Sequence, residues 1–146
     1  MATFHYQSQP TRTLIGAEPI RVYRRVTLNK DGLVIPADRN TFEIGVLDGP
    51  CFDEGLECPV RWVTAPGVHL VTTNGPIPLL GNIFAADNGL VSSTGTILLG
   101  RAIQAATAAG DIIEILRGHA DGNSNRDNYQ AIPNAVVSQP TGSLEK

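Results

Sequence analysis

The sequence predicts a mainly β protein: a compact β-sandwich or small barrel built from an internal repeat, with extended N- and C-terminal arms. Three observations lead to this class. The chain holds 15 glycines and 10 prolines among 146 residues, which favours short strands and many turns. Short stretches alternate apolar and polar residues, and one pattern of glycines occurs twice. We expect an N-terminal arm at residues 1–18, a β domain at 19–118 and a C-terminal arm or tail at 119–146.

Residues 1–18 show no sustained period and predict an extended arm. Its apolar side chains are Phe4, Tyr6, Leu14 and Ile15. Such an arm packs on its own domain or grips a neighbouring molecule. We therefore predict these four residues as partner contacts.

The strands of the first half are predicted from alternation. Residues 20–28 alternate well enough for one half-buried strand. The pair Asp31-Gly32, followed by a short apolar run, predicts a hairpin. Further strands are predicted at residues 42–47, 57–64 and 68–73.

The second half begins with a proline-rich loop or protected edge at residues 74–81. Residues 82–93 predict a strand, an Asn88-Gly89 turn and a return strand. A strand at 96–104 and an alanine-rich turn follow. Residues 110–117 predict a last strand whose two faces are both covered, because its apolar residues are nearly continuous.

The two halves share their glycine positions. The tetrapeptide at Asp31 (DGLV) matches the one at Asn88 (NGLV). The matching glycines are Gly32 with Gly89, Gly45 with Gly100, and Gly55 with Gly110. Glycine after Asp or Asn supplies the positive φ of a tight turn, and glycine inside a strand marks a bulge or a close approach. These roles need no ligand, so the pattern indicates a duplicated β scaffold.

Composition argues against several partners and compartments. The net charge of −3 is unlike the basic balance of most nucleic-acid binders. No apolar stretch is long enough for a membrane helix, and residues 1–10 lack a signal peptide's apolar core. We therefore expect no nucleic-acid or membrane partner, and synthesis in the cytoplasm. Cys51 and Cys58 are interpreted as small, half-buried apolar residues, with a disulfide left open.

A search for catalytic and cofactor motifs predicts neither an enzyme nor a cofactor or metal site. The sequence has no phosphate loop, no dinucleotide fingerprint, no H-E-x-x-H and no G-x-S-x-G. The string Asp121 to Asp127 spaces its polar residues like a calcium loop. However, Arg126 stands where that loop needs glycine and Ile132 where it needs glutamate. We interpret the string as a flexible turn, with ion binding left open.

Basic residues and one tryptophan are the remaining candidates for partner contacts. Arg21, Arg24 and Arg25 cluster on the first predicted strand. They either protect a charged edge strand from aggregation or meet an acidic protein partner. Trp62 is either a core residue or an interface anchor.

The stretch from residue 81 to residue 117 resembles the closing segment of the capsid cement, or head decoration, proteins of tailed bacteriophages. The resemblance lies in the order of short elements: Asn88-Gly89-Leu90-Val91, then Leu99-Gly100-Arg101-Ala102, then Gly110-Asp111 and a final apolar strand. Residues 42–63 resemble the family's preceding half.

The resemblance implies a viral structural protein that binds the outside of the capsid. It further implies a homotrimer that contacts the major capsid protein and holds its subunits together. The alternative, from a different class, is a small β module on the virion surface that recognises carbohydrate or a host surface.

Overall fold

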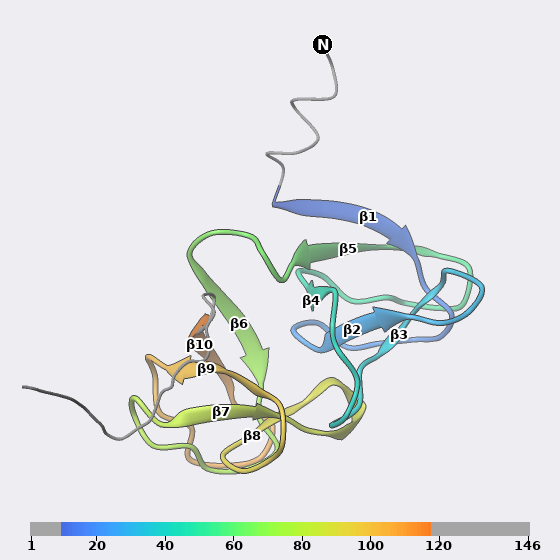
Figure 1. Ribbon diagram of the computed structural model, residues 1–146. Helices are drawn as coiled ribbons and strands as arrows, with labels where there is room; N and C mark the ends of the chain where they lie inside the picture. Colours follow the sequence, from blue (N-terminus) through green and yellow to red (C-terminus); the bar gives the residue numbers. More distant parts are fainter. Residues whose placement is uncertain (1–9, 118–146) are drawn as a thin grey trace, which may run out of the picture. The chain divides into compact units, whose positions relative to one another are not determined.

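The computed structural model describes residues 10–117 of the chain (Figure 1). It confirms the predicted mainly β class, because these residues form two five-stranded antiparallel sheets that do not close into a barrel. Within the described range, no helix is long and apolar enough to cross a membrane.

The two sheets are formed by consecutive halves of the chain. The first contains β1 (Thr11–Ile15), β2 (Arg25–Leu28), β3 (Val34–Pro36), β4 (Gly45–Leu47) and β5 (Glu57–Trp62). The second contains β6 (Val68–Thr72), β7 (Asn82–Ala85), β8 (Val91–Ser92), β9 (Leu98–Ala102) and β10 (Ile112–Arg117), with a short 3-10 turn, η1 (Asp87–Gly89), before β8. We call these halves the first and second repeats.

Strand order confirms the predicted duplication. The first sheet runs β1-β5-β4-β2-β3 and the second runs β6-β10-β9-β7-β8. Each strand of the second sheet thus takes the place of the strand five earlier in the chain. Isolated bridges repeat as well, since Ile20 pairs with Cys51 as Ile77 pairs with Ala106.

The turn before β2 has the same unusual backbone as the turn before β7. Tyr23 and Leu80 both lie in the left-handed region, each with φ of 62°. This conformation costs a residue with a side chain roughly 1–2 kcal/mol. At both positions the amide donates to the last carbonyl of a neighbouring strand, Tyr23 to Leu47 at 2.9 Å and Leu80 to Ala102 at 2.8 Å. Both repeats therefore keep the costly conformation for the same pairing.

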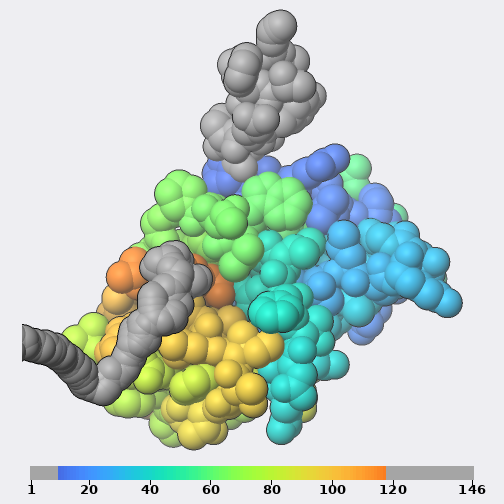
Figure 2. All heavy atoms as spheres, in the orientation of Figure 1, coloured from blue at the N-terminus to red at the C-terminus, as the bar shows by residue number. Residues whose placement is uncertain are grey.

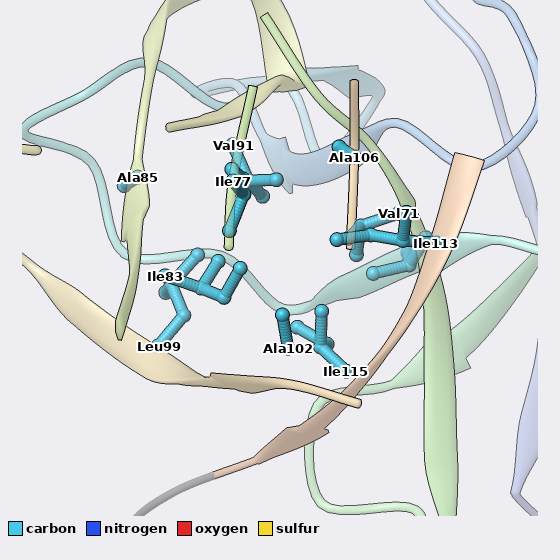
Figure 3. Close-up of a cluster of buried hydrophobic side chains, with 11 residues drawn as sticks. Val71, Ile77, Ile83, Ala85, Val91, Leu99, Ala102, Ala106, Ile113 and Ile115 are labelled. Carbon is cyan, nitrogen blue, oxygen red and sulfur yellow. The ribbon is translucent and has the colours of Figure 1, made fainter. Parts of the chain in front are cut away.

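Each repeat has its own hydrophobic core, and the buried positions correspond. The pairs are Ile20 with Ile77, Val26 with Ile83, Val34 with Val91, Leu47 with Ala102, Cys51 with Ala106, Cys58 with Ile113, and Val60 with Ile115. Figure 3 shows the side chains of the second core pointing toward one another from β6, β7, β9 and β10. Burying one such aliphatic side chain contributes about 1.5–3 kcal/mol. Cys51 and Cys58 are fully buried free thiols, rather than the half-buried residues expected.

Three predictions about the elements were wrong. Thr11–Ile15, assigned to the N-terminal arm, forms β1 and pairs with β5. The single strand predicted at 20–28 is interrupted at Tyr23, and only Arg25–Leu28 forms β2. The last strand is covered on one face only, because Ile113 and Ile115 are buried while Ile112 and Leu116 are exposed. The predicted C-terminal arm at 119–146 lies outside the described residues.

Candidate functional site

The apolar residues predicted as partner contacts separate into three groups. Phe4 and Tyr6 lie outside the described residues. Leu14 and Trp62 are partly buried and pack against the first core. Ile15, at the end of β1, is 39% exposed and remains available to a partner. Of the two interpretations of Trp62, a core residue therefore fits its position better than an interface anchor does.

The predicted cluster of basic residues is divided between the surface and the interior. Arg21 is exposed. Arg24 is half-buried, and its Nη1 donates to the carbonyl of Asn88 at 3.0 Å. Burial, together with the charge of Arg21, lowers the pKa of Arg24. Arg25 has no exposed surface, so its prediction as a partner contact was wrong.

Arg25 instead joins the two repeats. Its Nε donates to the carbonyl of Leu90 at 3.0 Å, and its Nη2 donates to the carbonyls of Ala37 (3.2 Å) and Ala86. Nη1 lies 3.2 Å from the carboxylate of Glu43. A guanidinium can satisfy several acceptors held in a fixed fork, which a lysine cannot do. The sequence alone showed an arginine on a strand but not the carbonyls that would surround it.

The junction between the repeats is close-packed around this arginine. Gly89 of η1 lies against β2, where a Cβ would come within 2.7 Å of the Arg25 carbonyl oxygen. Its amide donates to Ala37 at 2.7 Å. Val46 of β4 belongs to the core of the second repeat rather than to its own. In the space-filling view, the cyan segment that contains Val46 adjoins the yellow segment of the second repeat (Figure 2).

Exposed apolar side chains lie together on the paired strands β6 and β10. Leu116 and Val68 are register partners, 52% and 37% exposed. Ile112 is 46% exposed, and Leu70 is half-buried opposite Glu114. We call Val68, Leu70, Ile112 and Leu116 the β6–β10 face. Alternation along each strand sends His69, Val71, Ile113 and Ile115 inward, which is why these four residues, with Glu114 between Ile112 and Leu116, lie on the outward side.

Sequence reasoning missed the β6–β10 face because it treated apolar residues on both sides of a strand as evidence that both sides are covered.

Apolar exposed positions also gather where the first sheet ends. Leu56 is 48% exposed, and Phe52, four residues earlier, is 76% exposed. The Leu56 carbonyl accepts a hydrogen bond of 2.9 Å from the amide of Gly16, which is next to Ile15 in the chain. Their counterparts in the second repeat, Thr107 and Asp111, are polar. An exposed apolar surface of this kind is typical of a protein contact site.

A polar hollow of about 450 Å³ is lined by Arg39, Asn74, Asp87, Asn88 and other residues around η1. The Arg39 guanidinium binds the Asp87 carboxylate at 3.0 and 2.6 Å and holds the pKa of that carboxyl below its usual range. The pair is exposed, and its geometry fixes η1 against the 37–40 loop. Across residues 10–117, no group of three or more His, Cys, Asp or Glu side chains could hold a metal ion.

Comparisons with known proteins give a match in fold. No family model matches the chain, and no curated protein matches it. Among solved structures, the fold is similar to the N base of head fibre gp8.5 in bacteriophage phi29, with a TM-score of 0.62. The match covers 74% of this chain and 92% of that one at 18% sequence identity, so what the two chains share is the fold.

Proposed function

We propose that this chain is a bacteriophage structural protein whose β domain binds the outer surface of the head. In this role it stabilises contacts between major capsid protein subunits. The observation that carries the proposal is the fold shared with a protein that is, by its name, the base of a phage head fibre. The cement-protein resemblance of residues 81–117 supports the same class of function. The proposal includes no reaction, cofactor, nucleic acid or membrane.

The β6–β10 face is the surface we assign to the head. Its most exposed side chains are aliphatic, and the half-buried Glu114 lies between Ile112 and Leu116 on the same side of the sheet. Binding would remove these aliphatic side chains from water. Each Å² of apolar area removed would contribute about 25 cal/mol of favourable binding free energy. Ile15, Phe52 and Leu56 offer a second apolar contact from the other repeat.

We also propose that the protein acts as a homotrimer on the virion exterior. Three linked copies bind with an avidity that exceeds the affinity of one, because the first contact raises the effective concentration of the others. A seam between capsid subunits would then be held from several points at once.

The direct test mixes the purified protein with expanded, undecorated phage heads, followed by pelleting and by measuring the temperature at which the heads release DNA or dissociate. We expect the protein to pellet with the heads and to raise that temperature. Leu116→Asp should weaken pelleting about tenfold or more, as truncating a central interface residue does. Leu28→Asp is the matched control, because Leu28 is 41% exposed on β2, outside the β6–β10 face.

Heads that do not bind the wild-type protein, or that bind it without any gain in heat resistance, would overturn the proposal. Equal pelleting of Leu116→Asp and Leu28→Asp would overturn the assignment of the β6–β10 face. Binding to a glycan panel without binding to heads would favour the alternative, a module for carbohydrate or a host surface.

A further inference from the structure

The junction between the two repeats joins unlike surfaces. One partner is a turn of the second repeat, Ala86–Leu90, which we call the inserted turn. The other is a strand surface of the first repeat, formed by Tyr23, Arg25 and Val46, which we call the receiving surface. Arg25 donates to Leu90 and Ala86 of the turn, and Tyr23 and Val46 pack against the second core.

Each of these surfaces has a counterpart in the other repeat. On the receiving surface, Arg25 and Val46 are register partners on β2 and β4. Asn82 and Arg101 are register partners on β7 and β9 in the same way, with Leu80 in the place of Tyr23. The counterpart of the inserted turn is Asn29–Leu33, in which the Asn29 amide donates to Leu33 at 2.9 Å as Ala86 donates to Leu90 at 3.0 Å.

Both counterparts are uncovered within residues 10–117. Leu80 is 58% exposed, and Asn82 and Arg101 are exposed, whereas Arg25 and Val46 are buried. A Cβ on Gly32 would meet no atom within 4 Å, whereas one on Gly89 would collide with β2. The chain therefore uses one turn and one receiving surface internally and presents one of each to solvent.

We propose that a second copy of this chain completes the pattern. The Asn29–Leu33 turn of one copy docks on the surface formed by Leu80, Asn82 and Arg101 of the next copy, head to tail, in the arrangement of the junction between the repeats but with Asn82 in the place of Arg25. The inference is independent of head binding and concerns the protein alone.

Charge supports this occupant. Where the internal junction has Val46, the second receiving surface has Arg101, whose Nη1 donates to the Leu80 carbonyl at 3.2 Å. Where the inserted turn has Asn88, the exposed turn has Asp31. The exposed turn thus carries a carboxylate and the surface that would receive it carries a guanidinium, and these opposite charges would attract each other.

The contact also restricts the form of assembly. A heterologous contact leaves one turn and one surface at the two ends of any open chain of copies. It therefore closes into a ring of copies or extends as a filament, and it excludes a two-fold symmetric dimer. The avidity proposed above would follow from a closed ring.

The test is sedimentation velocity of the full chain at rising protein concentration, with charge reversals on the two surfaces. We expect the wild type to associate beyond a dimer and both Asp31→Arg and Arg101→Asp to weaken association about tenfold or more, because like charges would then face each other. Carrying both substitutions in one chain restores the opposite charges and should restore association. Glu54→Arg, on an exposed residue outside both surfaces, is the matched control.

Urea unfolding checks that each variant is folded. We expect the urea midpoints of the variants to equal that of the wild type, because Asp31 and Arg101 are both exposed. A wild-type protein that stays monomeric at about 100 μM, well above the range of stable oligomers, would overturn the inference. So would single variants that associate like the wild type, or a double variant no better than either one. Failure of head binding with association intact would leave this inference standing.

Discussion

Arg25 and Glu43 form an ion pair of 3.2 Å in which the two side chains are 0% and 4% exposed. The pair lies where β2 of the first repeat meets the inserted turn of the second. Two buried charges are stable only when paired and fully hydrogen-bonded, and Arg25 meets that condition through carbonyls from both repeats. The junction of the repeats thus depends on one polar side chain surrounded by apolar packing.

Arg25→Met should destabilise the protein strongly. The substitution removes the guanidinium that pairs with Glu43 and donates to the carbonyls of Ala86 and Leu90, and breaking a buried ion pair costs about 3–5 kcal/mol. Urea unfolding measures the loss. Arg21→Met, on an exposed residue four positions earlier in the chain, is the control and should change the midpoint little. Equal midpoints for the two variants would contradict the role given to Arg25.

Gly89→Ala should destabilise the protein more than Gly32→Ala, although both glycines occupy equivalent turns with φ of +73° and +80°. Each substitution costs roughly 1–2 kcal/mol for the left-handed backbone. At Gly89 the new methyl also meets the Arg25 carbonyl, which adds about 1–3 kcal/mol of overpacking. Thermal and urea unfolding of the two variants test the difference, and a Gly32→Ala variant as unstable as Gly89→Ala would contradict it.

Asp111 should make stability depend on acid pH. Its Oδ2 accepts hydrogen bonds from the amides of Thr107 at 2.8 Å and Ala108 at 3.1 Å, and these lower the pKa of the carboxyl below its ordinary value of 3.8. The stabilisation is therefore present above that value and is lost as the pH falls through the lowered pKa.

The measurement compares wild type with Asp111→Asn by urea unfolding between about pH 7 and about pH 2, the range over which carboxylates protonate. The wild type should be the more stable at the neutral end, and the difference should shrink at the acid end. Glu54→Gln, on an exposed residue, is the control. A difference that stays constant with pH would show that the carboxylate charge has no part in the turn.

Cys58 should make stability depend on alkaline pH. Burial raises the pKa of the Cys58 thiol from 9.0 to about 11, and the neighbouring Cys51 adds to the shift. Between these values the thiol stays protonated in the folded protein and ionises in the unfolded chain. Stability should therefore fall as the pH rises from 9 to about 11.

The check is to follow the wild type and Cys58→Val over this range, because valine keeps the position apolar and has no proton to lose. The variant should lose less stability than the wild type on the way to pH 11. A thiol reagent at neutral pH should also modify Cys51 and Cys58 only after unfolding, since both are buried. Fast modification of the native protein would contradict the burial of the two thiols.

Several elements could be predicted because their causes are local. Asp31-Gly32 and Asn88-Gly89 mark turns that need positive φ, and the structure has φ of +80° at Gly32 and +73° at Gly89. The duplication was also visible, because equivalent turns need equivalent glycines. β1 was missed because the hydrogen bonds that make Thr11–Ile15 a strand come from β5, far along the chain.

The candidate site was predicted less well, for the same reason. Ile15, predicted as a partner contact, is 39% exposed, but Arg25 was taken for a surface charge and the β6–β10 face was taken for a covered one. Exposure depends on what the rest of the chain covers, and neither propensity nor alternation contains that information.

The sequence by itself determined that this protein is a duplicated β scaffold, because turn glycines and alternating strands act within a few residues. Only the tertiary structure decided how the two copies join and what they leave uncovered. The inserted turn covers Arg25 and the second core covers Val46, while the equivalent Asn82 and Arg101 remain exposed. Equivalent positions in two repeats of the same topology thus differ because burial is set by the neighbour that packs against them and not by the strand on which they lie.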